Sequence, residues 1–235
     1  MTDRLSNEKI LTAWEIGTHR GPVDRALVLL WAGQSETIAD PADLPLGIRD
    51  QQLLKLRAET FGDNLRCVTA CPNCDETLEF DLSSRFLMEG IPDRVAETVR
   101  IGGREFQLRP LNSRDLADAS NCADLEDAAD LLRHRICGFR TDEIPTGLIS
   151  ELDSHIEAHE ATTELTLSLT CIECSHRWSE LVDIGGFFWA ELEACAMRIF
   201  SDISEIARAY GWREKDILDL SPPRRQTYLT LARGG

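Results

Sequence analysis

Hydrophobic and polar residues alternate along four short stretches of the chain, and these stretches form two pairs, each around a C-x-x-C motif. Residues 66–70 and 77–82 flank Cys71-Pro72-Asn73-Cys74, and residues 164–169 and 177–182 flank Cys171-Ile172-Glu173-Cys174. A period of two is typical of half-buried strands. Each motif is therefore predicted to lie at the tip of a β-hairpin.

The remaining chain is mainly helical in pattern, because apolar residues recur every three or four positions. Helices are expected over residues 7–17, 22–32, 48–61, 125–137, 146–160 and 187–210, from about residue 113, over 212–218 and after 222. Ser6 is expected to cap the first helix, and Pro22 to begin the second. Gly102-Gly103 lies between two further alternating runs and predicts a third hairpin.

These elements predict an α+β fold, in which helical N- and C-terminal segments surround a split four-cysteine zinc ribbon with an inserted β-hairpin and helices. The expected parts are an N-terminal helical segment (1–63), the split ribbon (64–84 and 163–185), an inserted hairpin-plus-helices subdomain (85–162) and a C-terminal helical tail (186–235).

The two motifs together supply four thiolates, the ligand set of a tetrahedral structural zinc site with Zn–S distances of about 2.3 Å. We therefore expect one structural Zn²⁺, and its ligands are Cys71, Cys74, Cys171 and Cys174. Four protein ligands leave no position for water, so the site is expected to be structural and not catalytic. His176 could replace a thiolate, but with four cysteines present it is expected beside the site or at the surface.

Other roles fit these cysteines less well. Disulfides need an oxidising compartment, whereas Met1-Thr2-Asp3-Arg4 begins no signal peptide and a cytoplasmic location is expected. A thioredoxin-like pair needs a helix directly after the motif, where a strand pattern follows instead. A role as small buried apolar residues does not explain why the motif is duplicated. The other cysteines are expected to be free buried thiols: Cys67, Cys122, Cys137 and Cys195.

Charge narrows the range of partners. The net charge is −16 and the isoelectric point is about 4.7, which predicts repulsion from nucleic-acid phosphates. No apolar run is long enough to span a membrane. We therefore expect neither nucleic acid nor membrane as a partner. A zinc-ribbon transcription regulator is the alternative function, but the clustered Lys and Arg that it needs on the ribbon strands are missing.

The common catalytic motifs are also missing, since the chain has no glycine-rich phosphate loop, no H-E-x-x-H and no G-x-S-x-G. His155 and His159 share a helix face four residues apart, a spacing that could bind a metal but is more often a surface feature. A non-enzymatic protein is expected.

The C-terminal tail combines large apolar side chains with arginines. Ile217 and Leu218 are expected to fold back onto the long helix before them. Arg224, Arg225 and Tyr228 are expected to be exposed and to bind a partner protein, because arginine and aromatic residues dominate binding hot spots. The short helices also suggest a helix-turn-helix, but few arginines on a negative body disfavour DNA.

The tail contains the run ISEIARAYGWREKDILDL (203–220), followed by RRQTYL (224–229). It resembles the T-even-type phage baseplate hub assembly chaperone family, which also occurs in phage-like contractile injection systems. Residues 54–80 and 108–116 are similar to members of this family as well. The resemblance implies a small baseplate assembly protein, either a hub assembly chaperone or a small adaptor, whose partners are hub or spike proteins. It implies a place in the cytoplasm of the producing cell or in the assembled baseplate.

Overall fold

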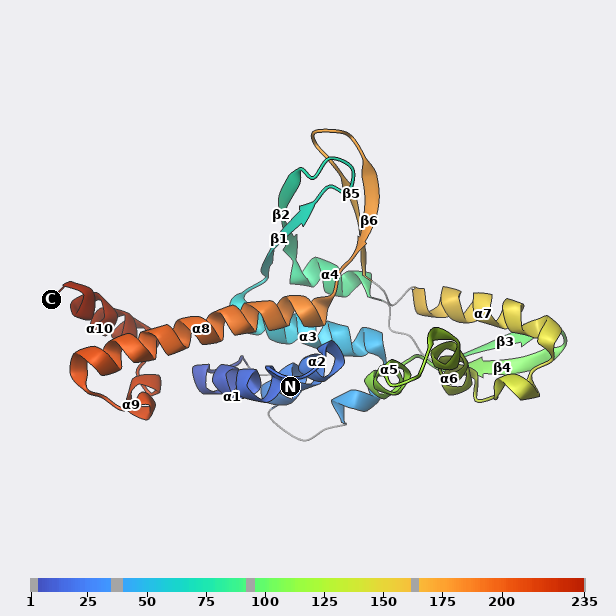
Figure 1. The fold of residues 1–235 in the computed structure, drawn as a ribbon, viewed down its shortest axis with the longest axis horizontal. Coiled ribbons are helices and arrows are strands. Elements are labelled where there is room, and N and C mark those ends of the chain that lie inside the picture. Colours follow the sequence, from blue (N-terminus) through green and yellow to red (C-terminus); the bar gives the residue numbers. More distant parts are fainter. Residues whose placement is uncertain (1–3, 35–39, 92–95, 162–164, 235) are drawn as a thin grey trace.

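The computed structural model describes residues 4–34, 40–91, 96–161 and 165–234. Helices and three separate two-stranded antiparallel sheets make up this part of the chain, so the predicted α+β class is confirmed. Figure 1 shows an elongated molecule with a helical body at its centre, two hairpins standing on the body, an inserted group of elements at one end and the C-terminal helices at the other.

The central body is built from helices of both ends of the chain. They are α1 (Asn7–Gly17), α2 (Pro22–Gly33), α3 (Leu46–Phe61) and α8 (Ile184–Tyr210). The apolar helix α2 buries Leu29 and Leu30 in a core that also contains Leu53 and Leu54 of α3 and Phe188 of α8. The N-terminal helices therefore complete their core only together with α8.

Local signals place the ends of these helices. The Ser6 side chain accepts a hydrogen bond from the Lys9 N–H and caps α1, and Pro22 begins α2, both as predicted. Helix α8 begins three residues earlier than expected, because the Asp183 side chain accepts from the Gly186 N–H. It ends at Tyr210, and the next residue, Gly211, caps it with a φ of 69° in the left-handed region.

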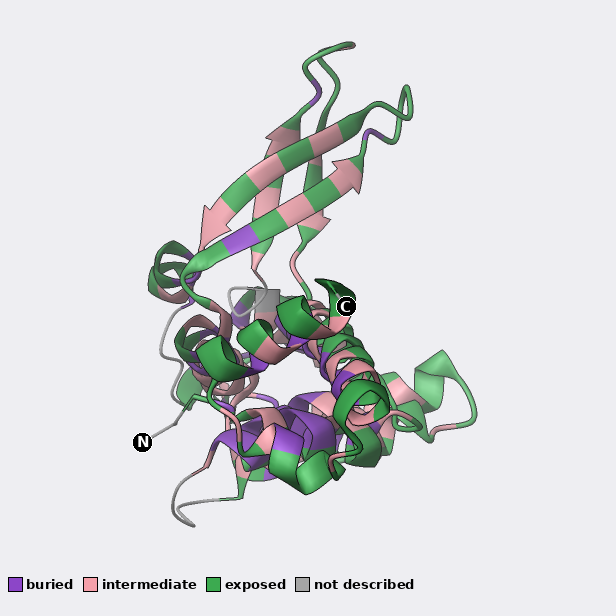
Figure 2. Ribbon diagram, turned by 90° about the vertical axis from the view of Figure 1, so that its left-hand side faces the viewer, coloured by how far each residue is buried: buried purple, intermediate pink, exposed green. Residues whose placement is uncertain are grey.

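The two predicted hairpins are present. Strands β1 (Asn64–Ala70) and β2 (Thr77–Ser83) form the first hairpin, and β5 (Thr166–Thr170) and β6 (Arg177–Leu181) form the second. Exposed residues alternate with half-buried or buried ones along the four strands, up to the last residue of β2, and Figure 2 shows this as green bands between pink and purple ones. Helix α4 (Ser84–Gly90) directly follows the first hairpin and was not expected; Ser83 caps it by accepting from the Phe86 N–H.

The inserted elements have a core of their own. They are β3 (Glu97–Ile101), β4 (Arg104–Leu108), α5 (Ser113–Ser120), α6 (Leu125–Cys137) and α7 (Thr146–Ala161), with a short 3-10 turn at Thr141–Glu143 (η2). Another 3-10 turn, Pro41–Asp43 (η1), lies outside the insertion between α2 and α3. Ile101, Phe106 and Leu108 of the predicted third hairpin pack against Ile136 and Leu152. Helix α4, in contrast, packs in the central core through Leu87.

The tail folds back on the end of the body. Helices α9 (Glu214–Leu218) and α10 (Pro222–Gly234) both contact α8. Ile217 is fully buried in the central core, and Leu218 is partly buried against it, as predicted for both residues.

Arg57 connects the body to the base of the first hairpin. Its side chain is almost fully buried and forms a bidentate ion pair with Glu191 of α8, at 2.6 and 2.7 Å. The same guanidinium donates to the carbonyl oxygens of Gly62 and Asn64, which lie at the start of β1, and to the Ser84 hydroxyl at the start of α4. A planar group with five donors in a fixed arrangement can hold all these elements at once.

We expect Arg57→Ala to lower the free energy of unfolding by about 3–5 kcal/mol, because it leaves Glu191 and two carbonyl groups without their donor. Arg100→Ala is the control. It removes an exposed ion pair with Glu105 and should cost at most about 1 kcal/mol. Denaturant titration of both variants measures the difference, and equal losses would contradict the role of Arg57.

Candidate metal centre

The two C-x-x-C motifs form turns of the same geometry. The Cys71 N–H donates to the Glu76 carbonyl (2.8 Å), as the Cys171 N–H donates to the His176 carbonyl (2.9 Å). In each turn the residue after the second cysteine has φ of 58°; these residues are Asp75 and Ser175. Each hairpin thus holds its two thiols in a turn of the same backbone geometry.

The two hairpins stand next to each other (Figure 1), and the turns at their tips bring the four predicted cysteines together. Sulfur atoms of Cys71 and Cys174 lie 3.6 Å apart, as do those of Cys74 and Cys171, and all four lie within 4.8 Å of one another. A tetrahedron of sulfur ligands at about 2.3 Å from a metal has edges of about 3.8 Å. The donor set and its spacing are therefore compatible with a bound metal ion.

The electrostatics of the four thiols also favour a cation. Hydrogen bonds from the Asn73 side chain and the His176 backbone lower the pKa of Cys174 to about 6. The Glu76 backbone N–H lowers the pKa of Cys74, but Cys174, desolvation and the other two thiols outweigh it and raise this pKa to about 12. Without a positive charge, one thiolate thus keeps a neighbour protonated, whereas a coordinating metal ion stabilises every thiolate.

His176 lies at the surface beside this cluster, as expected. Its ring stacks on Trp178 with the ring centroids 6.1 Å apart, and its side chain is exposed. The other cysteines lie elsewhere. Cys137 is buried as predicted, but the prediction of burial is wrong for three that are only partly buried: Cys67, Cys122 and Cys195.

The residues predicted to bind a partner differ in exposure. Arg224 is exposed, but the prediction that Arg225 is exposed is wrong, since it is only 6% accessible. Its guanidinium donates to the carbonyl oxygens of Leu218 (3.3 Å) and Leu220 (3.5 Å), which satisfies acceptors at the end of α9. Arg225 is therefore a structural residue of the tail.

Tyr228, the third predicted contact residue, is half-buried in an aromatic cluster. Its ring meets Trp212 edge-on at 4.8 Å and Tyr210 at 5.6 Å between centroids. The Tyr210 hydroxyl donates to the Tyr228 carbonyl oxygen (3.2 Å). Only part of Tyr228 is available to a partner.

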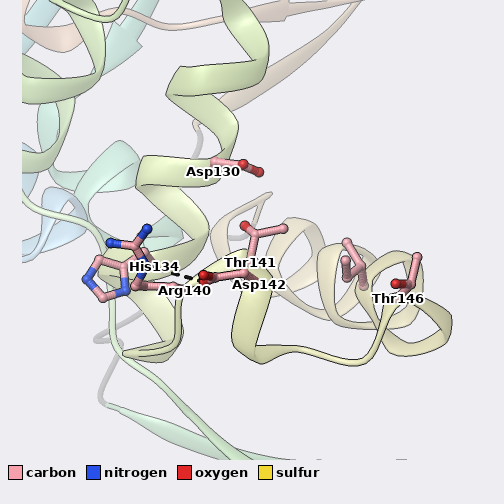
Figure 3. A pocket seen from close by; sticks show the side chains of 7 residues that line it. Asp130, His134, Arg140, Thr141, Asp142 and Thr146 are labelled. Carbon is pink, nitrogen blue, oxygen red and sulfur yellow. Dashed lines mark hydrogen bonds and ion pairs between the residues drawn. The ribbon is translucent and has the colours of Figure 1, made fainter.

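A hollow of about 540 Å³ lies in the insertion between α6, η2 and α7 (Figure 3). Its charged side chains are already engaged, because Arg140 pairs with Asp142 and Asp130 pairs with Arg133. The Thr141 hydroxyl is engaged as well, because it accepts a hydrogen bond from Arg133 (2.9 Å). His155 and His159 do not form a shared surface feature on α7, since His155 is exposed and His159 is buried.

Comparison of the chain with family models, with curated proteins and with solved structures found no match in any of the three. Within the described residues, no helix combines the length and the apolarity that crossing a membrane requires.

We expect Ser175→Gly to raise the free energy of unfolding of the hairpin by about 1 kcal/mol, because serine is strained in the left-handed region and glycine is not. Ser179→Gly is the matched control on extended backbone of β6 and should lower it by about 0.5–1 kcal/mol. Denaturant titration of metal-loaded protein gives both values. A loss of stability in Ser175→Gly would contradict the turn geometry.

Proposed function

We propose that Cys71, Cys74, Cys171 and Cys174 bind one structural Zn²⁺, which joins the two hairpins into a split zinc ribbon. The four gathered sulfur atoms carry this proposal. Away from the tips, the Thr69 hydroxyl donates to the Glu180 carboxylate (2.7 Å) and bridges the same two hairpins. Four thiolates complete a tetrahedral shell, so such an ion holds structure and activates no water.

Elemental analysis should find one zinc per chain. Cys71→Ser and Cys171→Ser should lose the metal to a similar extent, although they lie on different hairpins, because both thiolates bind one ion. Cys122→Ser is the control, since this residue lies in the insertion, and it should retain zinc. Zinc below about a tenth of an equivalent after reconstitution, or full retention in Cys171→Ser, would overturn the proposal.

We further propose that the chain is a non-enzymatic baseplate assembly protein of a contractile phage tail or contractile injection system, acting as a hub assembly chaperone or small adaptor. The observation that carries this proposal is the C-terminal run that resembles the hub assembly chaperone family. Its residues form the end of α8, α9 and α10, which pack together around Trp212 and Tyr228. Hub or spike proteins would be the partners, in the cytoplasm of the producing cell or in the baseplate.

Charge supports a protein partner over DNA. The body is acidic, and the burial of Arg225 removes one of the few cations that the tail could offer to phosphates. A zinc-ribbon transcription regulator is therefore the less supported alternative.

Tagged full-length chain, co-expressed with the tail proteins of its own gene cluster, should capture a hub or spike protein. Arg224→Glu should weaken this capture about tenfold, or ~1.4 kcal/mol, because an exposed arginine beside aromatic residues is a typical hot spot. Arg198→Glu, also exposed but on the shaft of α8, should have little effect. Submicromolar, sequence-selective DNA binding by the wild-type chain would instead establish the regulator.

A further inference from the structure

Strand β5 differs from every other described strand because it contains no charged residue. Each of the others carries at least one: Arg66 in β1, Glu79 and Asp81 in β2, Glu97 and Arg100 in β3, Arg104 and Glu105 in β4, Arg177 and Glu180 in β6. Charged side chains on an edge strand are a common protection against pairing with another chain. In the described part of the molecule β5 pairs only with β6, so its second edge is free and lacks this protection.

The hydrogen bonds at the two ends of β5 define which residues face the free edge. The Leu165 carbonyl accepts from the Val182 N–H (2.8 Å), and the Cys171 N–H donates to the His176 carbonyl (2.9 Å), so Leu165 and Cys171 both face the neighbouring strand. Residues alternate in this respect along an antiparallel ladder. The residues that turn their backbone groups to the free edge are Thr166, Ser168 and Thr170.

The sequence of β5, Thr-Leu-Ser-Leu-Thr, is the same in both directions. When two copies lie antiparallel with Ser168 opposite Ser168, Thr166 lies opposite Thr170 and Leu167 opposite Leu169. Ser168 itself faces the free edge, so this register also pairs every free N–H and C=O of the three edge residues. The palindromic sequence and the alternation of backbone groups thus both place the centre of the β5–β5 register at Ser168.

We propose that β5 pairs with β5 of a second copy of this chain across a two-fold axis at Ser168, which gives a four-stranded sheet in the order β6-β5-β5-β6. Isologous contacts of this kind are the commonest way in which identical chains associate. The half-buried Leu167 and Leu169 of the two copies would then form one continuous apolar stripe on the face toward the first hairpin.

The lack of charged residues on β5 permits a second copy to approach at this edge. With a net charge of −16, two copies repel each other over most of their surfaces, and an uncharged strand lets them approach. The outward side chains of β5 are hydroxyl groups, which tolerate close cross-strand pairing with themselves. A strand from an unrelated protein would not require a sequence that is symmetric about Ser168.

Complementary charges at Ser168 test the register. Wild-type full-length chain should elute with a mass twice its 26.4 kDa when measured by light scattering across a concentration series. Ser168→Glu and Ser168→Lys should each weaken the dimer about tenfold or more, because each variant places like charges directly opposite. An equimolar mixture of the two should recover the dimer, since glutamate then faces lysine.

Ser179→Glu is the matched control, because Ser179 is an exposed serine opposite Ser168 on β6, and this variant should remain dimeric. Circular dichroism identifies any variant that fails to fold, and the recovery in the mixture also requires folded chains. A monomeric wild type at all concentrations overturns the proposal, including the case in which the edge captures a strand from another protein. Dimers that persist in Ser168→Glu, or a mixture that stays monomeric, overturn it equally.

Discussion

The ion pair between Arg57 and Glu191 is the interaction on which the relative placement of the parts depends. Arg57 holds the start of the first hairpin and of α4, whereas Glu191 belongs to the helix that directly follows the second hairpin. This buried pair therefore helps to fix the positions at which the two hairpins leave the body. Thiols at their tips meet at 3.6 Å only when these bases are correctly spaced.

Local patterns predicted much of this molecule. Alternating residues located the hairpins, helical spacing located α1, α2, α6 and α8, and the duplicated C-x-x-C located the cysteine cluster. These features are encoded within a few neighbouring residues. Helix α4 escaped prediction because seven residues with one buried leucine give little periodicity. The roles of Arg57 and Arg225 could not be predicted, because tertiary contacts determine their partners and an arginine in a sequence does not by itself indicate burial.

The described residues form two separate hydrophobic cores. The central core draws on helices from both termini, while the insertion encloses its own hairpin and helices. Within the insertion Arg109 pairs with the buried Asp115, and this pairing, with the hydrogen bond from the Asn112 N–H, outweighs burial and lowers the pKa of Asp115. The insertion thus has stabilising interactions of its own, and the two hairpins that carry the cysteines lie before and after it in the sequence.

The distance along the chain between Arg57 and Glu191 has a consequence for synthesis. They are 134 positions apart, so at 5–20 residues per second a ribosome adds Glu191 about 7–27 s after Arg57. During this interval the apolar faces of α2 and α3 have no α8 to cover them, and the guanidinium lacks its counter-charge. The nascent chain must carry an uncovered half-core outside the exit tunnel, while the insertion already has a hydrophobic core of its own. Chaperones that bind exposed apolar segments therefore have a defined window of action on this protein.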